Sequence, residues 1–392
     1  MEQNFAIAAQ WVLLALIATV LSIRLGISVA LVEIAVGVIG GSAMQLEITS
    51  WVTFLAGFGA VVLTFLAGAE IDPDSLKGNL KESLIIGFVS FLLPFLAGLL
   101  FAEYVFGWDG NAAKIAGIAL STTSVAVVYA VMVESGLSAS RLGQAILAAC
   151  FVTDLGTVLA LGLLFIGFSL KVVWFTAVMI VAVFTITPLA AKVFAWYGGR
   201  VSEPEIKFIF LVLLALAYLA VISGSEAVLP AYIIGMAMAR FFKQYKETLV
   251  KMRAIVFAVF TPFYFIKAGV LVSISALYTM FGAILVFLLV KMAAKFIGVL
   301  PATRWFHYAP RTGVYTTLLM STGLTFGTIS ALYGLTNHYI DDSQYSVLVA
   351  TVILSAVLPT MIAQKWFFPL EATTDEPPTA MANLISNKRE AD

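Results

Sequence analysis

The sequence predicts an all-α integral membrane protein with about thirteen transmembrane helices. Of its 392 residues, 61% are hydrophobic and only 11% are charged, and the mean hydropathy is +1.03. A soluble globular protein carries about 25% charged residues. The apolar stretches have the length of a spanning helix, about 20 residues, and lack the short alternating pattern of an outer-membrane β-barrel.

The thirteen stretches are placed along the chain by their apolar runs. The first lacks the basic segment and the cleavage site of a signal peptide, so it is expected to be a span. The spans are expected near residues 5–23, 27–42, 51–69, 83–106, 113–133, 142–168, 172–197, 206–223, 226–242, 255–273, 277–300, 311–334 and 345–368. The polar remainder, 369–392, is expected to be a short disordered cytoplasmic tail.

Basic residues predict the orientation, because an odd number of spans places the termini on opposite sides. Of the 22 Lys and Arg residues, seventeen belong to the side that includes Arg24, and only Lys114 and Lys171 belong to the other. The positive-inside rule therefore predicts a multi-pass protein of the cell (inner) membrane, with the N-terminus outside and the C-terminus cytoplasmic. Acidic residues also number 22, and this balance without long basic runs suggests no nucleic-acid partner.

Three pairs of segments resemble each other at offsets close to 200 residues. The pairs are 29–41 with 227–239, 63–71 with 263–271, and 121–137 with 321–335. They relate spans seven apart, an odd shift, so the copies cross the membrane in opposite directions. Such an inverted-topology repeat, here about 27–168 and 226–368, is typical of secondary transporters, whose sites lie near the midplane.

The fifth and twelfth spans contain the short sequences "LSTTSVA" and "MSTGLTFG". Ser, Thr and Gly weaken a helix, and hydroxyls with freed carbonyls can coordinate a dehydrated cation where both helices break. The candidate ligands are Thr123, Ser124, Ser321 and Thr322. The alternative is that small hydroxylated residues only allow close helix packing, but their placement in both repeats favours ion binding.

Asp154 lies in the middle of the sixth span, after Thr153. A carboxylate at that depth costs several kcal/mol or gives up its charge. Because one carboxylate can hold either a proton or a cation, competition at Asp154 would couple the two, with Thr153 as a further ligand. The alternative is a neutral Asp154 that only hydrogen-bonds a neighbouring helix. Cys150, the single cysteine, excludes an internal disulfide and is expected to be a packing residue.

Three lysines lie inside predicted spans. Lys291 and Lys295 share one face of the eleventh span at a spacing of four residues. Lys295 is expected to be the charge partner of Asp154, although snorkelling to the interface would also explain it. Lys267, between Pro262 and Gly269, is the second candidate partner. Lys291 stays undecided between an idle and a functional role.

The sequence resembles the monovalent cation:proton antiporter superfamily, in the branch of bacterial sodium/proton antiporters and glutathione-gated potassium efflux proteins. The segments that carry the resemblance, which extends to about residue 368, are 65–76, 119–156, 261–277 and the repeat pair. The resemblance implies two crossed discontinuous helices, a homodimer in membrane lipid, and an elevator motion. In that motion a core slides against a dimerisation domain. The core comprises 83–168 and 277–368, and the dimerisation domain comprises 5–69 and 206–273.

The resemblance also assigns residues. Thr123 and Ser124 match the family's Thr-Ser pair, Asp154 its transport aspartate and Lys295 its basic residue of the eleventh span. The sequence departs where electrogenic members carry Asp-Asp, because Thr153 replaces the first acid, and the twelfth-span motif lacks Arg and Glu.

The expected function is therefore secondary-active exchange of Na+ or K+ for protons, with electroneutral stoichiometry and a role in pH homeostasis. Neither enzyme activity, a cofactor nor a nucleotide-binding domain is expected. The alternatives are a gated monovalent cation channel or a transport-dead sensor on the same fold.

Overall fold

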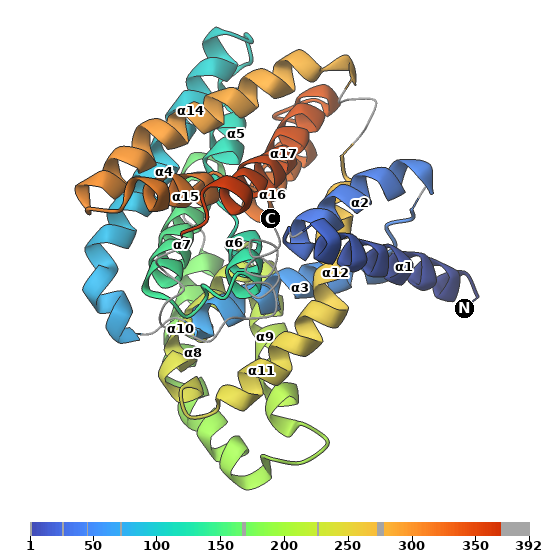
Figure 1. The fold of residues 1–392 in the computed structure, drawn as a ribbon, viewed down its shortest axis with the longest axis vertical. Helices are drawn as coiled ribbons and strands as arrows, with labels where there is room; N and C mark the ends of the chain where they lie inside the picture. The colour runs from blue at the N-terminus through green and yellow to red at the C-terminus, as the bar shows by residue number, and fades with distance from the viewer. Residues whose placement is uncertain are drawn as a thin grey trace, which may run out of the picture.

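Every regular element in the described part of the chain is a helix (Figure 1). The computed structural model describes residues 2–25, 27–44, 46–70, 73–166, 170–225, 227–272 and 278–369. The α-helices are α1 (Glu2–Leu25), α2 (Val29–Ala43), α3 (Ser50–Ala69), α4 (Pro73–Tyr104), α5 (Gly110–Ser121), α6 (Val125–Glu134), α7 (Arg141–Leu161), α8 (Leu170–Tyr197), α9 (Pro204–Ile222), α10 (Val228–Phe242), α11 (Lys246–Ile255), α12 (Thr261–Val270), α14 (Phe281–Trp305), α15 (Pro310–Met320), α16 (Thr325–Thr336) and α17 (Asp342–Trp366). Two π-helical turns, Gly162–Ile166 and Val256–Phe260, extend α7 and join α11 to α12.

Eleven helical segments in the described ranges are long and apolar enough to cross a membrane, and α2 and α10 are shorter apolar helices. Each of these two has 15 residues, so it extends about 22 Å, less than the ~30 Å of the hydrocarbon layer. The prediction of an all-helical membrane protein is confirmed. The count of thirteen full spans is not, because α2 and α10 are shorter than a full crossing. The predicted tail, 369–392, lies outside the described residues after Pro369.

Two of the spanning segments are interrupted where the sequence predicts weak helix. α5 ends at Ser121 and α6 begins at Val125. In the second segment, α15 ends at Met320 and α16 begins at Thr325. Ser124 caps α6, since its side chain accepts a hydrogen bond from the backbone of that helix. The predicted breaks are therefore present in the structure.

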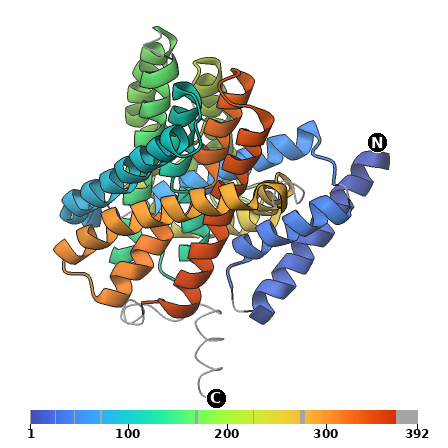
Figure 2. The ribbon, with the colours of Figure 1, turned by 90° about the horizontal axis from the view of Figure 1, so that it is seen from above.

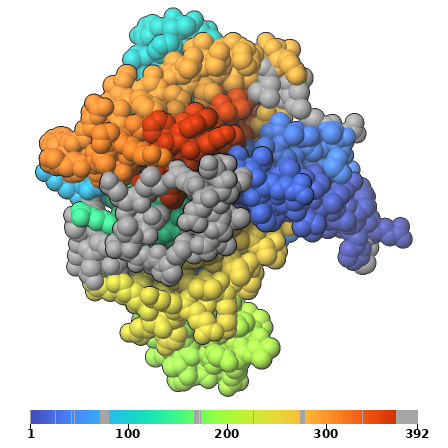
Figure 3. Space-filling view, viewed as in Figure 1, coloured from blue at the N-terminus to red at the C-terminus, as the bar shows by residue number. Residues whose placement is uncertain are grey.

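The helices pack in two groups that meet along α6 and α17. In one group, α2 packs on α12 and α3 packs on α10; in the other, α4 packs on α5, α7 and α14, and α17 packs on α14–α16. α6 touches α3, and α17 touches α2. Figure 2 shows α1 and α2 to one side of α4 and α14, and Figure 3 shows the surfaces of α14–α17 and of α8–α12 in different parts of the molecule.

Glycines set the distance between the helices of the first group. Gly37 of α2 faces Gly269 of α12, and a Cβ on Gly269 would lie 2.1 Å from a carbonyl oxygen of α2. Gly68 of α3 faces Gly235 of α10, where a Cβ on Gly68 would lie 2.4 Å from a carbonyl oxygen. Gly235 follows Gly37 by 198 residues and Gly269 follows Gly68 by 201. The repeat offset seen in the sequence therefore relates two similar glycine contacts.

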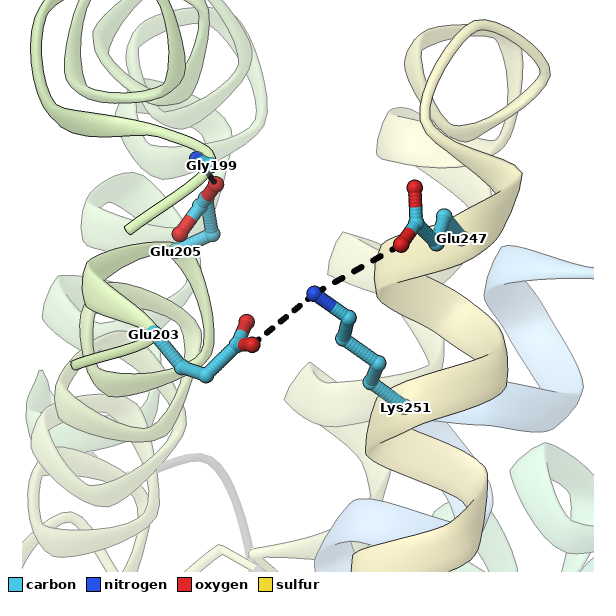
Figure 4. A network of polar contacts seen from close by, with 5 residues as sticks. All are labelled: Gly199, Glu203, Glu205, Glu247 and Lys251. Atoms are coloured by element: carbon cyan, nitrogen blue, oxygen red, sulfur yellow. Dashed lines mark hydrogen bonds and ion pairs between the residues drawn. The ribbon is translucent and has the colours of Figure 1, made fainter. Parts of the chain in front are cut away.

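A polar network joins the loop before α9 to α11 (Figure 4). Lys251 of α11 contacts Glu203 at 2.8 Å and Glu247 at 3.7 Å. Glu205 accepts a hydrogen bond of 2.7 Å from the backbone N–H of Gly199. The Lys251 side chain is 41% exposed, so this ion pair contributes little to stability and marks a solvated end of the bundle.

Gly269→Ala should destabilise the protein by about 1–3 kcal/mol, because the added methyl group meets backbone that cannot rotate away. The control is Gly57→Ala in α3, where a Cβ meets nothing within 4 Å and the better helix propensity of Ala is expected to be neutral or stabilising. Thermal unfolding in detergent measures both. Equal melting temperatures for the two variants would contradict the close α2–α12 contact.

Candidate functional site

The two helix breaks touch each other in the middle of the second group. The Thr123 hydroxyl donates a 2.9 Å hydrogen bond to the Met320 carbonyl oxygen. The backbone N–H of Ser124 donates to the Thr322 hydroxyl at 3.5 Å, and the hydroxyls of Ser124 and Thr325 lie 3.4 Å apart. The structure therefore brings three of the predicted ligands, Thr123, Ser124 and Thr322, into one polar contact.

Hydroxyl groups also occupy the last turns before each break. Ser121, Thr122 and Thr322 each donate to the carbonyl oxygen three residues earlier, and Ser321 donates to the one four residues earlier, at 2.7–3.0 Å. The last carbonyls of a helix have no partner within it, and these side chains satisfy some of them. Ser321 is fully buried, but its hydrogen bond turns back into α15 and not toward the other break.

Lys295 of α14 lies at the break between α5 and α6. Its ammonium donates to the Ser90 hydroxyl at 2.8 Å, the Thr123 hydroxyl at 2.9 Å and the Ser121 carbonyl oxygen at 3.1 Å. A cation at a helix C-terminus is stabilised by the helix dipole. Lys295 is an electrostatic neighbour of Asp154. The predicted direct ion pair between the two side chains is not formed among the described residues.

Lys291, one turn before Lys295 on α14, lies at the other break. Its ammonium donates to the Ser355 hydroxyl at 2.9 Å. A Cβ on Gly323 would lie only 2.3 Å from the Lys291 nitrogen, so the glycine makes room for the ammonium. The sequence left Lys291 undecided. The structure shows that its spacing of four residues from Lys295 places one lysine at each break.

Asp154 of α7 is 4% exposed, and its Oδ1 atom is buried without a hydrogen-bond partner among the described residues. Cys150, one turn earlier on α7, contacts Met320 at the end of α15, with the two sulfur atoms 3.7 Å apart. Residues four apart share a face of a helix, so Asp154 lies on the face of α7 directed at the breaks. A buried carboxylate oxygen without a donor is a site that a proton or a cation can occupy.

Thr153 lies on another side of α7. Its hydroxyl contacts the carbonyl oxygens of Ala149 at 3.0 Å and of Gly87, in α4, at 3.2 Å. These contacts use its only hydrogen and fix α7 against α4. The structure thus places Thr153 at a packing contact, apart from the hydroxyls gathered at the breaks.

Tyr264 of α12 is a site residue that the sequence did not predict. Its hydroxyl hydrogen-bonds to that of Thr325, the first residue of α16, so the first group of helices also contributes to the site. Lys267, three residues later, is partly exposed and makes no hydrogen bond or ion pair to another described residue. The structure does not bring Lys267 to Asp154, although a tyrosine in the same Pro- and Gly-flanked segment reaches the site.

The donors around the breaks are one carboxylate, several hydroxyls and backbone carbonyls. Such oxygen ligands suit alkali-metal cations and other hard ions. Across the described ranges, no group of three or more His, Cys, Asp or Glu side chains is placed to hold a metal ion. The chemistry that this arrangement supports is reversible binding of a monovalent cation or a proton.

The comparisons with known proteins agree on one family. The family model described as "Sodium/hydrogen exchanger, transmembrane" matches residues 12–368. The chain is 27% identical to the Na(+)/H(+) antiporter of Enterococcus hirae over 88% of this chain and 93% of the relative. It is 25% identical to the Na(+)/H(+)-K(+) antiporter GerN of Bacillus cereus, over 87% and 91%.

A solved structure shares the fold. The sodium proton antiporter MjNhaP1 from Methanocaldococcus jannaschii aligns with a TM-score of 0.74 and 16% identity, covering 97% of this chain and 99% of that one. At this level of identity the match concerns the fold alone.

Lys295→Gln should lower the stability of the protein by about 1–3 kcal/mol, because a charged donor to three oxygens is lost. Its maximal transport rate should fall by a smaller factor than its folding equilibrium constant. The control, Lys267→Gln, removes a partly exposed lysine and should leave the melting temperature within about 1 °C of the wild type. Unchanged melting for Lys295→Gln would show that its three hydrogen bonds contribute nothing to the fold.

Proposed function

Since the chain belongs to the sodium/hydrogen exchanger family, we propose that it is a secondary-active antiporter that exchanges a monovalent cation, Na+ or K+, for protons. The observation that carries this proposal is Asp154, whose buried Oδ1 has no donor among the described residues and whose helix face meets two broken helices. The names of the relatives in Enterococcus hirae and Bacillus cereus support the same chemistry.

Competition at Asp154 explains the coupling. A proton and a dehydrated cation require the same lone pairs of one carboxylate, so binding of one releases the other. Ser124, Thr123 and Thr322 supply hydroxyl oxygens at the crossing, and Ser321 and Thr153 line the surrounding core. Lys295 keeps a positive charge near the site, which lowers the cost of an ionised Asp154 when no cation is bound.

Alternating access would come from an elevator motion of the core, 83–168 and 277–368, against a dimerisation domain, 5–69 and 206–273. The packing into two groups supports this division, since few elements, chiefly α6, α17 and Tyr264, connect them. We propose a homodimer in the cell (inner) membrane, with the N-terminus outside and the C-terminus cytoplasmic, contacting only lipid and a second copy.

Asp154→Asn should reduce exchange to the background of empty vesicles while the protein still folds, because the amide cannot release a proton for a cation. The test uses proteoliposomes with a pH-sensitive dye and Na+ or K+ added in turn. The control is Asp342→Asn, which changes an exposed aspartate at the start of α17. Wild-type exchange by Asp154→Asn would overturn the proposal.

Exchange should also be electroneutral, because Asp154 is a single acid where electrogenic relatives carry a pair. Thr153 stands in place of the other acid of that pair. One proton then leaves for each cation, and the rate should not depend on the membrane potential. A net charge would couple to the potential by about 2.3 kcal/mol per 100 mV. Sodium-driven exchange is measured with the potential clamped at zero and then at a negative value by a potassium–valinomycin gradient.

Two outcomes of that measurement contradict the assignment. A rate that follows the potential, with proton movement retained, would show that Lys295 carries a second proton. A sodium current without proton movement would instead identify a channel.

A further inference from the structure

Two further buried acids lie away from Asp154, where α2 meets α6 and α17. Glu33 of α2 is 2% exposed, and Glu134 is the last residue of α6. The Glu134 carboxylate accepts a 2.8 Å hydrogen bond from the backbone N–H of Val29, the first residue of α2. Glu33 follows Val29 by one turn, on the same face of that helix. Side chains of a helix point toward its N-terminus, so the Glu33 carboxyl is directed toward the end of α2 that Glu134 contacts.

Each of these acids has one oxygen atom without a partner. Glu33 Oε2 and Glu134 Oε1 are buried and have no hydrogen-bond partner among the described residues. Ser28, at the N-cap of α2, is 0% exposed. Its backbone N–H donates to Gln364 of α17 at 3.2 Å.

Another acid of this protein, by contrast, is paired with a basic side chain. Glu70, at the end of α3, pairs with Arg253 of α11 and accepts a 2.6 Å hydrogen bond from Tyr129 of α6. No basic residue pairs with Glu33 or Glu134 in the ranges that the structure covers. The ionisable side chains on the helices packed against α2 and α6 are Glu2 and Arg24 on α1, Tyr129 on α6, Arg141, Cys150 and Asp154 on α7, Tyr264 and Lys267 on α12, and Asp342, Tyr345 and Lys365 on α17, with Glu70 at the end of α3.

Two adjacent buried carboxylates without a cation would repel each other, so at least one of them must be neutral. A proton on one of the two acids removes this repulsion and gives that acid a hydrogen to donate. The backbone of α2 stabilises the charge that remains on Glu134, since an anion is favoured at a helix N-terminus.

We propose that Glu33 and Glu134 form a second proton-binding site, which shares one proton and fastens α2 of one helix group to α6 of the other. With the proton bound, the acid pair and the Val29 contact hold the two helices together. Without it, two anions face each other across the boundary between the groups. This site does not depend on the proposed function of Asp154, and its proton is not a transported one.

The test uses the full chain in detergent with Asp154→Asn throughout, so that the transport carboxylate cannot titrate. An unfolded chain loses its glutamate protons near pH 4.3, whereas the folded chain keeps the shared proton to higher pH. The folded state then binds more protons, and its stability falls as the pH rises. The melting temperature should fall by roughly 1–2 °C per pH unit above pH 5.

Adding Glu33→Gln should remove this slope, because its amide donates to Glu134 at every pH. Glu134→Gln should do the same while still accepting from Val29. The control, Glu247→Gln, changes a side chain that is 86% exposed and should retain the slope. Equal slopes in all the variants would overturn the proposal.

Infrared spectroscopy gives a readout that does not depend on how stably each variant folds. At neutral pH the Asp154→Asn protein should show the carbonyl band of a protonated carboxylic acid. The band should disappear on adding Glu33→Gln or Glu134→Gln and remain with Glu247→Gln. Its absence from Asp154→Asn itself, or its persistence in both glutamine variants, would contradict a shared proton.

Discussion

The interaction on which the structure depends is the meeting of two interrupted helices inside an apolar layer. Within the hydrocarbon there is no water to satisfy free carbonyl and N–H groups, so irregular backbone is tolerated only where the protein supplies partners. Here the partners are hydroxyls of the breaks themselves, such as Thr123 on the Met320 carbonyl, and the ammonium groups of α14. The breaks, the lysines and Asp154 form one polar unit surrounded by buried apolar side chains.

Lys291 and Lys295 each lie beside one of the two breaks in this polar unit. Lys295 donates to the end of α5 and Lys291 lies beside Gly323 after the end of α15, so each brings N–H donors to a helix C-terminus. The twelfth-span motif lacks charged residues, but the second break still has a polar partner, because α14 places the Lys291 amine beside Gly323. One helix with a spacing of four residues serves both breaks.

Much of this was predictable from the sequence, and the rest depended on tertiary contacts. The apolar runs predicted the helices, and "LSTTSVA" and "MSTGLTFG" predicted the breaks because Ser, Thr and Gly are weak helix formers. Sequence could not show that Thr153 turns toward Gly87 of α4, since the rotation of α7 is set by its neighbours. Nor could it choose Tyr264 over Lys267 on α12, because both lie in one apolar segment and only the packing decides which reaches Thr325.

Three acids in the helix bundle differ in the donors that contact them, and this difference bears on the proposed motion. Glu70 is held by Arg253 and Tyr129, Glu134 by the backbone of α2, and Asp154 Oδ1 by none of the described residues. An acid with fixed donors favours one arrangement of helices, whereas an acid without them exchanges its ligand easily. If the core moves as proposed, α6 must leave α2 and α3, so the Glu70 and Glu134 contacts must break in each cycle. These contacts, and the hydrogen bond between Tyr264 and Thr325, hold the two groups in the arrangement seen here.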